Sequence, residues 1–167
     1  IGSPLFTDFY TALGANPTQM SQTDMQPALA TGAVDGTDQS VEGFRLLKLA
    51  TLGQKHLTLL NYCYEPVVFT VNQSVWKSWS PADQEVVRSV AVEQGLHMRQ
   101  MKRKGLNAAD RSQIDEMKAT GTDVVTLTPA EVSVFRQATK SVYDKWAKQL
   151  DAELVAEAEK VSRTVAP

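Results

Sequence analysis

The chain has 167 residues, of which 43% are hydrophobic and 22% are charged, an ordinary balance for a globular domain with a hydrophobic core. Its formal net charge of −2 gives no reason to expect a nucleic acid or an anionic membrane as a partner, and no apolar run approaches the roughly 18 residues that a membrane-spanning helix needs. The single cysteine, Cys63, cannot form an internal disulfide and is interpreted as a small buried side chain.

Helix signals come first along the chain. A Ser-Pro pair at 3–4 is typical of an N-cap followed by the first helical residue, and Gly14 is expected to end this helix. Thr23 and Gln26 have the spacing of a capping box, which predicts a second helix that ends at Gly32. The chain therefore begins with two short helices joined by an extended segment.

Strands and helices then alternate. A short strand is predicted at 33–36, and a helix is predicted from about residue 41 to Gly53. Two further strands, at 56–64 and 66–72, are indicated by their β-branched and aromatic residues. This alternation favours an α/β fold with parallel strand pairs.

The second half of the chain is mainly helical. Helix starts are signalled by an Asn, a Ser-Pro pair and a Thr-Pro pair, at Asn72, 80–81 and 128–129. The first of these helices carries Trp76 and Trp79, which are interpreted as core residues. The second is expected to reach Lys118 with a weak point near Gly105, and a strand at 124–127 separates it from helical sequence that continues almost to the end. So long a helical tail needs a further surface to pack on, which indicates an incomplete domain.

Motifs of known catalytic chemistry are absent from the sequence. It contains no G-x-x-x-x-G-K-[ST] phosphate loop, no G-x-G-x-x-G dinucleotide fingerprint and no G-x-S-x-G nucleophile elbow. The two histidines, His56 and His97, lie far apart and in no zinc-binding spacing. We therefore expect no catalytic residue, no metal site and no cofactor.

Six segments in order along the chain match the motifs of one protein family. They are ALGANPTQM, ALATGAVDG, LTLLNY, VNQSVW with WSPADQ, LTPAE and VYDKW, at 12–20, 28–36, 57–62, 71–84, 127–131 and 142–146. Together they resemble the solute-binding proteins of TRAP transporters, the DctP family, over nearly the whole chain. One such segment would be a weak signal, but six in the right order with plausible spacing are a strong one.

The resemblance implies a fold. Members of this family have a periplasmic-binding-protein-like, two-lobed α/β fold, about twice as long as this chain, that closes like a hinge on its ligand. Residues 1–167 would be the C-terminal portion of such a protein. Within it, residues 1–72 would form a ligand-lobe segment with hinge strands, and residues 73–167 a mainly helical segment packed across both lobes.

The function implied by the resemblance is transport and not catalysis. Such a protein captures a small organic acid, for example a dicarboxylate, in the periplasm and delivers it to the membrane permease of its TRAP transporter. The expected partners are therefore a small carboxylate ligand, the TRAP membrane permease subunits and the missing N-terminal half of the same protein. No nucleic acid is expected.

The resemblance also implies ligand contacts. Gln39 stands where the family's VDG motif leads to a ligand-binding asparagine, and Asp38 replaces the preceding glutamate. Gln22 occupies the place of a frequent aromatic residue, and Tyr62 that of a frequent histidine. The family's carboxylate-binding arginine is expected upstream of this chain, and Arg45, in an ordinary exposed helical pattern, is no obvious substitute. These polar replacements favour a hydroxylated or amide-bearing acid as the ligand.

Two other functions stay open. The chain could be a self-contained protein-interaction module whose long C-terminal helices form a docking surface, without any small-molecule ligand. It could also be an enzyme that uses Asp35 and Asp38 as paired carboxylates, although a spacing of three residues around a glycine turn does not ensure that they share a pocket.

Overall fold

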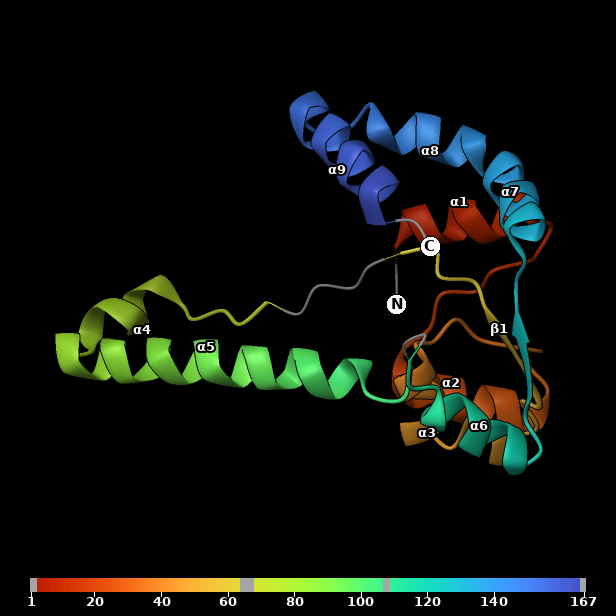
Figure 1. Cartoon of the computed structure of the whole chain (residues 1–167), viewed down its shortest axis with the longest axis horizontal. Helices are drawn as coiled ribbons and strands as arrows, with labels where there is room; N and C mark the ends of the chain where they lie inside the picture. The colour runs from red at the N-terminus through yellow and green to blue at the C-terminus, as the bar shows by residue number, and fades with distance from the viewer. Residues whose placement is uncertain (1–2, 64–67, 107–108, 166–167) are drawn as a thin grey trace. The chain divides into compact units, whose positions relative to one another are not determined.

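Helices make up most of the part of the chain that the computed structural model describes, residues 3–63, 68–106 and 109–165 (Figure 1). The elements in chain order are α1 (Pro4–Ala12), α2 (Gln22–Thr31), α3 (Val41–Leu46), the 3-10 helix η1 (Leu49–Leu52), β1 (His56–Leu59), α4 (Gln73–Ser78), α5 (Pro81–Arg103), α6 (Ser112–Ala119), β2 (Asp123–Thr126), α7 (Pro129–Ala138), α8 (Lys140–Ala147) and α9 (Ala152–Val165). They form two compact units. The terminal unit comprises Ile1–Asp38 and Leu127–Pro167, and the central unit comprises Gln39–Thr126.

The terminal unit is held together by contacts between its first and last helices. Helix α1 packs against α8, where Asp8 accepts hydrogen bonds from Lys145 Nζ at 2.6 Å and from Trp146 Nε1 at 2.8 Å. The hydroxyl of Tyr143 on α8 donates to Glu159 on α9 at 2.5 Å. Polar bonds of this kind join α8 both to the beginning of the chain and to its final helix.

The central unit contains a two-stranded parallel sheet. Strands β1 and β2 pair in register, with Leu57 beside Val124, and the segment between them holds α4, α5 and α6. A connection of this length is what parallel strands require, because a tight turn can join only antiparallel ones. Among the described residues of this unit, the buried apolar side chains are Phe44, Leu49, Ile114, Met117 and Val124. The expected α/β fold with a parallel strand pair is confirmed.

Side-chain caps fix where several helices begin. Ser80 and Thr128 cap α5 and α7 as predicted, each side-chain oxygen accepting a bond from the backbone N–H three residues further on. The capping box predicted at Thr23 is wrong. The N-cap of α2 is Ser21, whose side chain accepts a bond from the backbone N–H of Asp24, so the helix begins two residues earlier than predicted. Gly32 ends α2 as predicted, with the positive φ of 72° that glycine adopts without strain.

The longest predicted helices are interrupted in the structure. The helix expected from 41 to 53 divides at Lys48, whose φ of 51° lies in the left-handed region and ends the α-helical path. The helix expected to reach Lys118 stops at Arg103, and Gly105 with a φ of 77° redirects the chain before α6. The C-terminal helical stretch likewise divides into α7, α8 and α9.

The predicted strands are shorter than expected or absent. Residues 33–36 form no strand. In the described part of the strand predicted at 56–64, residues 56–63, only β1 forms, and residue 64 lies outside the described residues. Residues 68–72 also form no strand, and the remaining part of that prediction lies outside the described residues. A strand needs a neighbour for its backbone N–H and C=O groups, and no described segment pairs with 68–72. The β-branched and aromatic composition of 68–72 therefore does not by itself predict a strand.

Three predictions of burial are wrong. Cys63 is exposed, and Trp76 and Trp79 are only half-buried, with ring centroids 5.7 Å apart. The two rings are tilted by 59° to each other, and the guanidinium of Arg88 lies over the ring of Trp76, so both indoles belong to a partly exposed cluster and not to a core. The proposed division at residues 1–72 and 73–167 concerns the lobes of a complete protein and stays a prediction. None of the described helices is both long and apolar enough to cross a membrane.

Candidate functional site

The segment between α2 and α3 carries two of the predicted ligand contacts. Asp38 is exposed, whereas the next residue, Gln39, is partly buried and immediately precedes Ser40, the N-cap of α3. Ser40 Oγ accepts a hydrogen bond from the backbone N–H of Gly43 at 3.1 Å. Gln39 is therefore the last residue before a capped helix, and its backbone is held by the element that follows it.

The side chain of Gln39 folds back over the first turn of α3. Its Oε1 lies 2.8 Å from the point that a Cβ atom would occupy on Gly43, and its own Cβ lies 3.7 Å from that point. Carbon and oxygen atoms that are not bonded do not approach so closely, so this position accepts only glycine while Gln39 keeps its place. The sequence signal for this contact was a glycine inside a predicted helix, four residues after the candidate.

Gln22 is the first residue of α2, and its side chain is exposed. The helix itself is anchored, because Met25 and Leu29 are each only 5% exposed and the N-cap Ser21 accepts a bond from the backbone three residues on. Gln22 therefore begins a helix that its buried residues anchor, and its own side chain is exposed at the start of that helix.

Tyr62 lies beyond the carboxyl end of β1 and is half-buried. The residue before it, Asn61, has a φ of 48°, a left-handed conformation that asparagine tolerates better than most residues. The chain therefore turns sharply just after the strand. In α/β folds the carboxyl ends of parallel strands are the usual place for ligands, and Tyr62 follows such an end.

Two arginines of the central unit make contacts that the sequence did not reveal. Arg45 donates to Gln113 Oε1 at 2.8 Å and to Glu116 Oε2 at 3.0 Å, joining α3 to α6 (Figure 1). Its guanidinium thus bonds two side chains of α6 at the surface of the unit, and whether Arg45 has any part in ligand binding stays a matter of prediction. Arg111 donates to Thr126 Oγ1 at 3.2 Å, which places a cation at the carboxyl end of β2.

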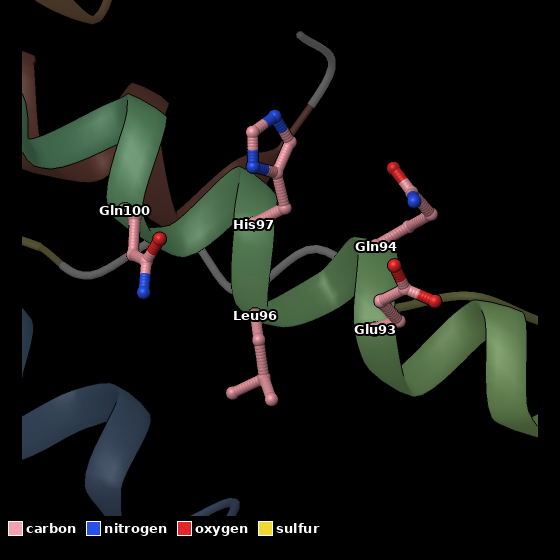
Figure 2. A pocket seen from close by; sticks show the side chains of 5 residues that line it. All are labelled: Glu93, Gln94, Leu96, His97 and Gln100. Atoms are coloured by element: carbon pink, nitrogen blue, oxygen red, sulfur yellow. The ribbon is translucent and has the colours of Figure 1, made fainter.

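Helix α5 borders two surface hollows, and neither is lined by Gln22, Asp38, Gln39 or Tyr62. One, of about 490 Å³, is lined by Phe69, Val71, Gln73, Trp76, Val87, Arg88, Ala91 and Val92. The other, of about 450 Å³, is lined by Glu93, Gln94, Leu96, His97 and Gln100. Figure 2 shows that all five of these side chains belong to one stretch of α5 and that His97 and Leu96 leave it in opposite directions, so this hollow is open helix surface.

The described residues contain no group of three or more His, Cys, Asp or Glu side chains placed to hold a metal ion. The predicted contacts are amide, carboxylate and phenol groups, which are suited to hydrogen bonding with a polar ligand. Gln39 lies against the first turn of α3, and neither of the two hollows beside α5 contains any of the four candidates.

Comparison with known proteins identifies relatives of one kind. Residues 1–149 match the family described as bacterial extracellular solute-binding protein, family 7. The chain is 30% identical over 147 residues to the C4-dicarboxylate-binding periplasmic protein of Rhodobacter capsulatus, covering 87% of this chain and 42% of that protein. It is 29% identical over 125 residues to the 2,3-diketo-L-gulonate-binding periplasmic protein of Escherichia coli K12, covering 74% of this chain and 36% of that protein.

A solved structure gives a stronger match. The TRAP periplasmic solute-binding protein of Ralstonia eutropha H16, crystallised with bound (S)-2-acetolactate, is 48% identical to this chain and superposes with a TM-score of 0.92. The match covers 96% of this chain and 51% of that structure. The chain therefore spans about half of the solved relative and less than half of the curated ones.

Proposed function

The chain belongs to family 7 of the bacterial extracellular solute-binding proteins, the DctP family, and from this membership we propose that it is part of the periplasmic component of a TRAP transporter that captures a small hydroxylated carboxylic acid. The observation that carries the proposal is the 48% identity, over 96% of the chain, with a binding protein whose bound ligand is (S)-2-acetolactate. That ligand has a carboxylate, a hydroxyl and a keto oxygen on four skeletal carbons.

The residues at the proposed site suit such a ligand. Gln39 offers both an N–H donor and a carbonyl acceptor, so it can bond a hydroxyl group, which itself donates and accepts. Asp38, Gln22 and Tyr62 are proposed as further polar contacts. A buried hydroxyl of the ligand needs hydrogen-bond partners, and amide and phenol groups supply them without adding charge.

The proposal includes the rest of the fold. Since the solved relative is about twice as long as the region matched, we propose that an N-terminal half of the same protein supplies the second lobe and the arginine that binds the ligand carboxylate in two-pronged geometry. The loaded protein would then deliver its ligand to the membrane permease subunits, with no chemical change in the ligand.

The test is isothermal titration calorimetry of the protein joined to its N-terminal half, with (S)-2-acetolactate and with succinate, a dicarboxylate that lacks a hydroxyl. We expect acetolactate to bind and to bind more tightly than succinate. Gln39→Ala should weaken acetolactate binding up to about tenfold, since one net hydrogen bond is lost. The matched control is Gln94→Ala, the same substitution on the surface of α5 (Figure 2), which should leave the affinity unchanged.

Failure of both acids to bind would contradict the proposal. The protein-interaction module would then become the leading interpretation of this chain. Tighter binding of succinate than of acetolactate would retain an acid-binding protein but overturn the hydroxylated ligand class. Uptake of the bound acid by membrane vesicles that contain the permease would test delivery separately.

A further inference from the structure

Gly43 occupies an unusual position for a glycine. It lies inside α3, where glycine is less favourable than alanine by about 1 kcal/mol because of its greater freedom in the unfolded chain. Its backbone does not explain the choice, since Gly43 is not among the glycines with positive φ. An L-residue could adopt the same backbone conformation without strain, so the reason for glycine must lie in what surrounds this position.

The surroundings of Gly43 are two side chains from the preceding loop. A Cβ there would stand 2.8 Å from Gln39 Oε1 and 3.2 Å from Ser40 Oγ. The first distance is shorter than real contacts allow, and the second is tight. The atom that would have to move farthest is therefore the carboxamide oxygen of Gln39, the end of a flexible side chain and not part of the backbone.

We infer that Gly43 is a positioning residue of the ligand site, which leaves room for the Gln39 carboxamide to lie against the first turn of α3 and so fixes where that amide meets the ligand. This inference rests on the proposed function, because it takes Gln39 as a ligand contact. Ser40 holds the turn through its bond to the backbone N–H of Gly43, so the same short helix positions both the backbone and the side chain of Gln39.

The prediction is that Gly43→Ala displaces the carboxamide without unfolding the protein. Alanine favours the helix, and only the flexible end of Gln39 has to yield, so the Tm should stay equal to or above that of the wild type. The affinity for (S)-2-acetolactate should fall about tenfold, by the loss of one well-placed hydrogen bond. The matched control is Gly95→Ala in α5, which also adds a methyl to a helical glycine but meets nothing within 4 Å.

A measurement without ligand tests the geometry directly. The side-chain amide cross-peak of Gln39 in a ¹H–¹⁵N NMR spectrum, assigned by its loss in Gln39→Ala, should move in Gly43→Ala and stay in place in Gly95→Ala. An unmoved cross-peak in Gly43→Ala would overturn the inference whether or not any acid binds.

A double-mutant cycle separates positioning from a general effect on the helix. If Gly43 acts through Gln39, adding Gly43→Ala to Gln39→Ala should cause no further loss of affinity. Additive losses would show that Gly43 acts on the ligand by another route and would overturn the inference. Ser40→Ala, which removes the cap alone, should lower the Tm, and an unchanged Tm in Gly43→Ala would show that the cap survives there.

The two proposals fail in different ways. If Gln39→Ala weakens binding and Gly43→Ala does not, the positioning role of Gly43 is contradicted and the proposed transport function is retained. If the wild-type protein binds neither (S)-2-acetolactate nor succinate, the proposed transport function is contradicted.

Discussion

Trp146 donates its indole N–H to Asp8 across 138 positions of sequence, at 2.8 Å. The neighbouring Lys145 donates to the same carboxylate oxygen at 2.6 Å, so consecutive residues of α8 both bond to one acid on α1. The VYDKW segment, which contributed to the family resemblance, thus has a structural role in this chain. Its residues Lys145 and Trp146 connect α8, in the C-terminal part of the chain, to α1.

The first prediction concerns this tie. Asp8→Ala removes the carboxylate that accepts both bonds, so the half-buried indole N–H of Trp146 loses its hydrogen-bond acceptor. We therefore expect the Tm to fall by several degrees. The measurement is thermal unfolding followed by circular dichroism. Asp144→Ala is the control, because its bond to Lys140 is an ordinary exposed pair within α8 and should contribute little. Equal effects of the two substitutions would contradict the prediction.

The second prediction concerns pH. Hydrogen bonds from Lys145 and then Trp146 hold the pKa of Asp8 below its ordinary value of 3.8. A carboxyl group with a lowered pKa in the folded protein stabilises it above the ordinary pKa, and this stabilisation is lost as the pH falls through the folded-state value. In urea unfolding between pH 7 and pH 3, the wild type should lose more stability than Asp8→Asn over the acid end of this range. If the unfolding free energies of the wild type and Asp8→Asn fall in parallel with decreasing pH, the prediction is wrong.

The third prediction concerns Gly105, which needs glycine for two reasons. Its φ is 77°, and a Cβ would stand 2.5 Å from Gln113 Cγ and 2.9 Å from the backbone nitrogen of Gln113. Gly105→Ala should therefore cost about 2–4 kcal/mol of unfolding free energy, from left-handed strain and overpacking together. Gly121→Ala is the control, because its φ of 90° carries the strain but nothing lies within 4 Å. Chemical denaturation should show the smaller loss for Gly121→Ala.

The fourth prediction compares two leucines of the central unit. Leu49 is 1% exposed, whereas Leu46, three residues earlier, is 73% exposed. Leu49→Ala should cost about 2–5 kcal/mol because it leaves a cavity, and Leu46→Ala about 0.5 kcal/mol or less. Urea denaturation midpoints give the comparison. Similar losses at the two positions would mean that the burial of Leu49 contributes nothing beyond its local helix.

Sequence patterns predicted the helix starts better than the helix ends. In a Ser-Pro or Thr-Pro pair, as at 80–81 and 128–129, the Ser or Thr side chain caps the helix through a bond to a residue three positions further on. Such a helix start can therefore be predicted from the neighbouring residues alone. The break at Lys48 is different, since a positive φ is uncommon for lysine and nothing in the local sequence indicates it. In the described part of the strand expected at 66–72, residues 68–72, no strand forms, because pairing depends on a partner elsewhere in the chain.

The candidate site was predictable only as a set of positions. The family resemblance identified Gln39, but for the contact between its carboxamide and Gly43 the sequence offers only a glycine inside a predicted helix, because the contact depends on the path of α3 and on a side-chain conformation. Asp38, Gln22 and Tyr62 stay predictions as ligand contacts, since their role depends on atoms that come from a ligand and from a second lobe. Arg111, at the end of β2, was missed because its contact with Thr126 spans 15 residues of loop, helix and strand.

The parallel pairing of β1 with β2 also governs the order of events during synthesis. His56 and Asp123, which face each other at the start of the two strands, are 67 positions apart. At about 5–20 residues per second, β1 leaves the ribosome roughly 3–13 s before β2 can pair with it. During that interval the backbone N–H and C=O groups of residues 56–59 lack the strand that pairs with them in the folded protein, so the growing chain can complete this sheet only after α4, α5 and α6 have been synthesised.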